Sequence, residues 1–98
     1  MNNLVNFAKK HYDGFRRFPK KQLRLFFEKY RETTVVDIEA GKIYGFLLYQ
    51  QWPDQAHFLC ACSIRRNPLT WLRREAKKLH QKVTWFDEDK MRLMTICQ

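Results

Sequence analysis

The segment Ala56–Phe86, AHFLCACSIRRNPLTWLRREAKKLHQKVTWF, changes its hydrophobic pattern twice. Residues 56–64 are apolar on both alternating faces, which is typical of a strand that is covered on both sides. Asn67 and Pro68 then suit the N-cap and the first position of a helix. The apolar residues that follow recur at helical spacing, at Leu69, Leu72, Ala76 and Leu79. Residues 82–86 return to a β-type pattern, so the segment predicts strand, helix and strand.

The sequence on either side of this segment predicts more strands and two helices. Residues 33–39 and 42–50 are strand-like and are separated by the turn signal Ala40-Gly41, and residues 91–97 predict a last strand. Apolar residues at helical spacing predict helices over residues 2–12 and 19–31. The expected fold is one α+β domain over residues 1–98: two N-terminal helices, an antiparallel β-meander, a helix and further strands.

The composition favours a negatively charged partner. Lys and Arg number 19 against 10 Asp and Glu, which gives a formal charge of +9. Such a charge suits nucleic acid, a phosphorylated cofactor, an acidic protein or a membrane surface. The opening residues MNNLVNFAKK lack a secretory pattern, and no apolar run is long enough to span a bilayer. Three cysteines without disulfide-framework spacing favour a reducing compartment, so we expect a cytoplasmic protein.

One family resemblance rests on the order of these elements. The stretch VVDIEAGKIYGFLLY (residues 35–49), followed by AHFLCACSI and a helix, resembles the central part of GNAT-type N-acetyltransferases. In that family the second strand of the meander often carries a Gly after a hydrophobic pair, as Gly45 stands here after Ile43-Tyr44. The resemblance covers most of residues 18–97 and implies a truncated GNAT-like sandwich with acetyl-CoA as cofactor. The residues that it implies as cofactor-binding are Ile64, Arg65, Arg66, Asn67 and Leu69.

The loop that would hold the cofactor departs from the family pattern. The GNAT phosphate loop is typically R/Q-x-x-G-x-G/A, whereas residues 63–70 contain no glycine. Pro68 also has no N–H to donate, so a phosphate would depend on the side chains of Arg65 and Arg66. We therefore expect a degenerate or minimal acyltransferase, either active or catalytically inactive.

The catalytic residues of the family have no counterpart on a matched motif. No tyrosine follows Tyr49, although the family often takes a Tyr general acid from its C-terminal part. Glu39 and His57 are candidate bases by residue type alone. If the chain is active, holding a thioester beside an amine would supply most of the catalysis through proximity.

The alternative function is a non-enzymatic basic module that binds nucleic acid or an acidic protein. Trp71 falls off the apolar stripe of its helix and near Arg74 and Lys78, where an aromatic among cations suits such a surface. The Trp71 ring packing under the preceding loop, on a solvated basic helix, is the competing interpretation. No helix-turn-helix, RRM, KH or zinc-finger signature is present. The candidate binding residues are Lys20, Lys21, Arg24, Trp71, Arg73, Arg74, Lys77 and Lys78. The small size and reduced motif are typical of a phage accessory or virion protein.

A metal site is not expected. Cys60 and Cys62 should point to one face of their strand and His57 to the other, and no second ligand pair completes a tetrahedral site. Buried core thiols are the simpler interpretation.

The last strand should form an exposed edge that Lys90 and Arg92 only partly protect, which would allow a homodimer by strand pairing.

Overall fold

The computed structural model describes residues 2–96, and it confirms the α+β fold and the predicted order of elements. The elements are α1 (Asn2–His11), α2 (Lys20–Lys29), β1 (Thr34–Glu39), β2 (Lys42–Gln51), β3 (Gln55–Ser63), α3 (Pro68–Lys78), β4 (Lys82–Asp87) and β5 (Arg92–Ile96). Short 3-10 turns lie at Asp13–Phe15 and Arg31–Thr33. Cys97, expected at the end of the last strand, lies outside the described residues.

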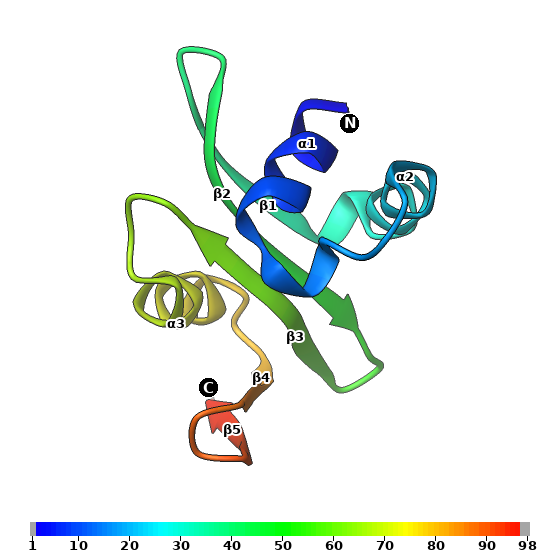
Figure 1. Ribbon diagram of the computed structural model, residues 1–98. Coiled ribbons are helices and arrows are strands. Elements are labelled where there is room, and N and C mark those ends of the chain that lie inside the picture. The colour runs from blue at the N-terminus through cyan, green and yellow to red at the C-terminus, as the bar shows by residue number, and fades with distance from the viewer. Residues whose placement is uncertain (1, 97–98) are drawn as a thin grey trace.

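The five strands form one mixed sheet in the order β1-β2-β3-β4-β5 (Figure 1). The first three strands form the expected antiparallel meander, and β4 and β5 form an antiparallel hairpin. The chain crosses over through α3, so that β4 runs parallel to β3. The sheet therefore joins two antiparallel units through a single parallel pair, and β5 lies at an edge.

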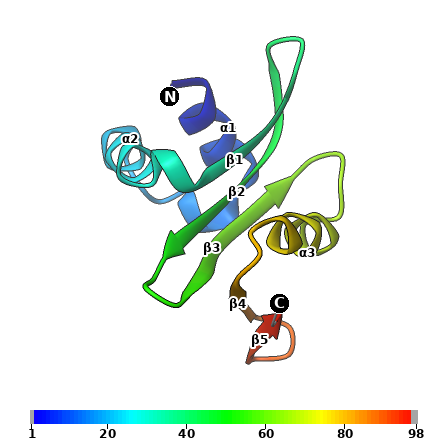
Figure 2. The same ribbon diagram turned by 180° about the vertical axis from the view of Figure 1, so that it is seen from behind.

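Each face of the sheet carries its own core. On one face α1 and α2 pack over the meander around Phe27, Phe46 and Leu48. On the other face α3 packs over β3 and β4 around Leu47 and Trp85. Figures 1 and 2 show these helices on opposite sides of the sheet. The alternation of Phe46, Leu47 and Leu48 between the two cores explains why β2 is apolar on both of its faces.

Gly45 allows β2 and β3 to approach closely where the meander meets α3. A Cβ atom at Gly45 would lie 2.5 Å from the carbonyl oxygen of Cys62. Gly45 pairs with Asp37 on one side and with Ser63 on the other. A side chain at this position would stand between those two polar groups, so the glycine leaves room for the contacts that they make with the β3–α3 loop.

A β-bulge at Leu59 inverts the side-chain alternation of β3. Leu48 pairs with Cys60 and Tyr49 pairs with Phe58, so Leu59 has no partner in β2. Phe58 consequently packs in the α3-side core, while Cys60 packs in the core under α1 and α2. The prediction that His57 points away from the cysteine thiols is therefore wrong. Alternation puts the His57 side chain on the face of the sheet opposite Phe58, which is the face under α1 and α2. The bulge places the Cys60 and Cys62 thiols on that face as well.

Candidate functional site

The parallel strands β3 and β4 pair at one end only and separate at the other. Their ladder runs from Gln55 and Lys82 to Phe58 and Trp85, and β3 continues to Ser63 without β4 beside it. The separation begins at the bulge, because the extra residue bends the strand. We call the wedge beyond Phe58 and Trp85 the fork. The backbone groups of residues 59–61 that face the fork have no β4 partner there.

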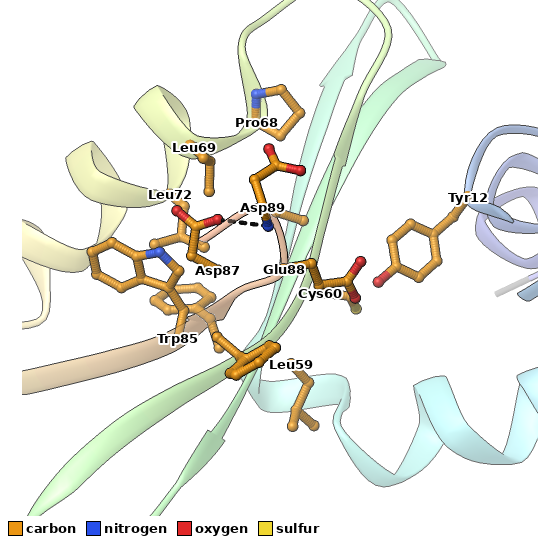
Figure 3. A pocket seen from close by; sticks show the side chains of 13 residues that line it. Tyr12, Leu59, Cys60, Pro68, Leu69, Leu72, Trp85, Asp87, Glu88 and Asp89 are labelled. Atoms are coloured by element: carbon orange, nitrogen blue, oxygen red, sulfur yellow. Dashed lines mark hydrogen bonds between the residues drawn. The ribbon is translucent and has the colours of Figure 1, made fainter. Parts of the chain in front are cut away.

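A cleft of about 300 Å³ occupies the fork (Figure 3). Its walls come from β3 and β4, from the first turns of α3, and from Tyr12 just beyond α1. The lining residues are Tyr12, Phe58, Leu59, Cys60, Ala61, Pro68, Leu69, Leu72, Trp85, Phe86, Asp87, Glu88 and Asp89. Two strands, two helix ends and a hairpin turn therefore converge on one hollow of a size that can hold part of a small ligand.

Three carboxyl groups, at the end of β4 and in the β4–β5 turn, line this cleft opposite Tyr12. Asp87 is buried, and its Oδ1 accepts hydrogen bonds from the backbone N–H groups of Asp89 and Lys90 at 3.0 and 3.2 Å. Figure 3 shows the Glu88 carboxylate directed toward the Tyr12 hydroxyl. Burial is the largest cause that raises the pKa of Tyr12 to about 12, and the nearby Cys60 and Glu88 groups add to it. Tyr12 is thus a neutral phenol at physiological pH.

No sequence motif identifies Tyr12 as a cleft residue. Tyr12 follows a short helix at the opposite end of the chain from the β4–β5 turn, and only the packing of α1 over β3 brings the two together. The Tyr12 ring packs on Phe15 and Phe46, so the side chain joins the core to the cleft.

Trp85 supplies an unused hydrogen-bond donor to the same region. Its side chain lines the cleft and is 4% exposed, yet its Nε1 has no hydrogen-bond partner within residues 2–96. An indole N–H that is buried without an acceptor is costly, so a bound carbonyl, carboxylate or water would be favoured beside it.

Arg65, expected to bind phosphate, is held by carboxylates of the chain itself. Its Nε and Nη2 donate to the two oxygens of Asp37 at 3.0 and 2.7 Å, and its Nη1 donates to Glu39 at 2.7 Å. The guanidinium also lies 4.0 Å from the centre of the Tyr44 ring. Hydrogen bonds from Arg65, opposed by burial and aided by Arg66, lower the pKa of Asp37 to about 2.

Arg66 shares Asp37 but keeps the outer part of its guanidinium available. Its Nε donates to Asp37 Oδ2 at 2.9 Å, and no partner for its terminal nitrogens occurs in the described part of the chain. The backbone N–H groups of both arginines donate to Ser63 Oγ, at 3.3 Å for Arg65 and 2.9 Å for Arg66. Asn67 Oδ1 accepts from the N–H of Thr70. The loop therefore satisfies most of its own backbone donors.

The other residues of the predicted cofactor loop separate. Ile64 is exposed, and its N–H donates to the Tyr44 carbonyl at 2.9 Å, beside the meander. Leu69 is 37% exposed and lines the fork cleft, although the helical pattern placed it in the core stripe. Leu69 is thus brought to the cleft, while Arg65 and Arg66 turn toward Asp37 on β1.

Neither candidate base reaches the cleft. Glu39 is paired with Arg65 at the β1–β2 end of the sheet. His57 lies at the paired end of β3, where its Nδ1 is 2.7 Å from the Thr84 hydroxyl and its ring stacks on Trp52. Burial lowers the pKa of His57, so its ring is neutral at physiological pH. Both side chains are engaged structurally and are far from Tyr12 along their strands.

The predicted basic surface is divided between the two faces of the sheet. Lys20, Lys21 and Arg24 lie on α2, while the remaining cations lie on α3 on the opposite side (Figures 1 and 2). Trp71 was expected among these cations, but it is 5% exposed and packs with Leu72 in the α3-side core. A buried ring cannot stack on a base, so the assignment of Trp71 as a binding residue is wrong. Arg73, Arg74, Lys77 and Lys78 remain exposed.

The cysteines described in β3 are both buried. Burial raises the pKa of the Cys60 thiol to about 12 and also raises that of Cys62, which keeps both thiols protonated. Within residues 2–96, no group of three or more His, Cys, Asp or Glu side chains is arranged to hold a metal ion. In the same part of the chain, no helix is both long and apolar enough to cross a membrane.

Comparisons with known proteins give no relative. No protein-family model matches the chain, and neither curated proteins nor solved structures yield a match. The functional interpretation therefore depends on the fork, its cleft and the charges around them.

Proposed function

We propose that this chain is a minimal GNAT-like acyltransferase domain that binds the acyl-pantetheine arm of acetyl-CoA in the fork between β3 and β4. The observation that carries the proposal is the parallel pair that separates at a bulge and leaves a cleft of about 300 Å³. An amide-containing chain can hydrogen-bond to the free backbone edge at residues 59–61 as an added strand would. The arm is uncharged, so the acidic side of the cleft does not repel it.

The arm also suits the apolar part of the cleft. Leu59, Leu69 and Phe86 line it and are each more than a third exposed, so they have apolar surface to offer a ligand. Trp85 also lines the cleft, and a carbonyl of the arm that reached its buried N–H would satisfy that donor. Apolar contact with a few placed donors is the usual composition of a small-molecule site.

If acyl transfer occurs, proximity supplies most of the rate and Tyr12 supplies a proton. An amine held beside the thioester attacks its carbonyl carbon, and the departing thiolate needs a proton. Tyr12 is a protonated phenol in the cleft wall, with a pKa of about 12. It is therefore the best-placed general acid among the described residues, and Glu88 is the carboxylate best placed to accept a proton from the amine.

The competing function is a basic module that binds nucleic acid or an acidic protein. The observation in its favour is the exposed row of α3 cations, of which only Lys78 is paired with an acid within residues 2–96, at 3.1 Å from Glu75. The α2 cations on the other face of the sheet would have to bind separately. The affinity of α3 alone for a polyanion would decrease steadily as the salt concentration increases.

The test is calorimetric titration of acetyl-CoA into the wild-type protein and into Leu69→Trp. Because Leu69 is partly exposed at the cleft, a larger side chain there should fill the site without disturbing the core. We expect saturable one-site binding to wild type and at least about tenfold weaker binding to Leu69→Trp.

Leu25→Trp is the matched control, because Leu25 is 65% exposed on α2, away from the fork. It should bind as wild type does. The proposal fails if wild type does not bind acetyl-CoA, or if the two tryptophan variants lose affinity equally. Binding of duplex DNA with a steep salt dependence, without acetyl-CoA binding, would favour the basic module instead.

A further inference from the structure

A second, smaller hollow lies on the outer side of the first turns of α3. It has a volume of about 210 Å³ and is lined by Arg66, Asn67, Thr70, Trp71 and Arg74. None of these residues lines the fork cleft. The two hollows therefore lie on different sides of the same helix, and the smaller one carries two guanidinium groups where the larger one carries carboxylates.

The two arginines next to each other in sequence have different capacities for a ligand. Arg65 uses Nε, Nη1 and Nη2 on Asp37 and Glu39, so its guanidinium is fully engaged by the chain. Within residues 2–96, Arg66 uses only its Nε, on Asp37, and its guanidinium carbon lies 5.7 Å from the centre of the Trp71 ring. Asp37 and Trp71 thus hold the Arg66 side chain beside the hollow, and its terminal nitrogens can donate to a ligand.

Helical spacing brings a second guanidinium and a hydroxyl to the same hollow. Thr70 and Arg74 are four residues apart on α3 and therefore lie on one face of the helix. In the described residues neither the Arg74 side chain nor the Thr70 hydroxyl has a hydrogen-bond partner or an ion pair. Two guanidinium groups and a hydroxyl around one hollow form a donor set that suits a tetrahedral, doubly charged oxyanion.

We infer that this hollow binds a phosphomonoester group through the side chains of Arg66, Thr70 and Arg74. The backbone N–H groups of Arg65, Arg66 and Thr70 contribute little, because the Ser63 and Asn67 side chains already accept from them. The phosphomonoester can belong to a nucleotide or be free inorganic phosphate, and both present the same dianion. This inference does not depend on acyl transfer, because the site is distinct from the fork.

The experiment is an NMR titration of ¹⁵N-labelled protein with inorganic phosphate at constant ionic strength. Wild type should show saturable shifts that include the amides of Thr70 and Arg74. Arg74→Gln should weaken the binding at least about tenfold, as expected for loss of a charge-assisted contact. Arg73→Gln is the control, because Arg73 lies beside Trp85 rather than in the hollow and the substitution changes the same charge.

Two outcomes overturn the inference. One is the absence of saturable shifts up to about 10 mM phosphate, because a specific site of this kind should have a dissociation constant below that concentration. The other is equal weakening by Arg73→Gln and Arg74→Gln, which would mean a diffuse positive field. Titration with adenosine 5′-monophosphate distinguishes the sources of the group. Binding about tenfold tighter than phosphate supports a nucleotide, and equal binding supports the free anion.

Discussion

Replacement of Asp37 by Asn should remove the contact that joins β1 to the β3–α3 loop. The hydrogen bonds from Arg65 and Arg66 lower the pKa of Asp37 from 3.8 to about 2. A shift of this size corresponds to about 2 kcal/mol of folding stability. The two guanidinium side chains are 33% and 40% exposed, so solvent screening reduces the expected loss to about 1 kcal/mol at neutral pH.

The stabilisation by Asp37 should depend on pH in a direction set by its pKa shift. The pKa of Asp37 is lower in the folded protein than in the unfolded chain. The stabilisation is therefore complete at pH values well above 3.8, and it is lost as the pH falls through 3.8 toward about 2. Urea unfolding followed by tryptophan fluorescence at neutral pH and near pH 2 measures the difference between wild type and Asp37→Asn. That difference should be about 1 kcal/mol at neutral pH and a small fraction of it near pH 2.

Asp54→Asn is the matched control, because Asp54 is an exposed aspartate in the β2–β3 turn. It should change the free energy of unfolding by less than about 0.5 kcal/mol at either pH. A difference between wild type and Asp37→Asn that stays constant with pH would refute the account of the ion pairs. So would equal effects of the two substitutions.

Three further predictions concern the sheet, the thiols and the cleft tyrosine. Gly45→Ala should destabilise the fold by about 1–3 kcal/mol, because its Cβ would lie 2.5 Å from the Cys62 carbonyl oxygen. An unchanged free energy of unfolding in urea would contradict the close approach of β2 and β3. In a Cys97→Ser background, Cys60 and Cys62 should react with a thiol reagent only after unfolding, because both thiols are buried and burial raises their pKa. Fast labelling of the native protein would contradict their burial. In a spectrophotometric titration of phenol ionisation, Tyr12→Phe should remove one component with a pKa of about 12, and loss of a component near 10 instead would mean that Tyr12 is solvated.

The sequence was sufficient for the order of elements because each carries a strong local pattern. The two-sided apolar runs identified β2 and β3, and Asn67-Pro68 identified the start of α3, where the Asn67 side chain does cap the Thr70 N–H. Such signals depend on residues close together in the chain. They give the elements reliably without saying how neighbouring strands align.

The errors came from contacts between distant residues. The bulge at Leu59 depends on how β3 aligns with β2, so nothing within β3 shows that His57 and the cysteines share a face. Arg65 was available for phosphate as far as the local sequence shows, because Asp37 lies 28 residues away. Trp71 falls outside the apolar stripe of its helix, yet it packs in the α3-side core with residues of β3 and β4.

The most direct test of the fork as the ligand site is amide shift mapping with acetyl-CoA. On ¹⁵N-labelled protein, we expect the largest shifts on Leu59, Cys60 and Ala61, which line the cleft beyond the end of the β3–β4 ladder, and on Leu69 at the start of α3. Saturable shifts at these residues would place the ligand between β3 and β4. Shifts confined to the exposed cations of α3, or no shifts at all, would contradict the account.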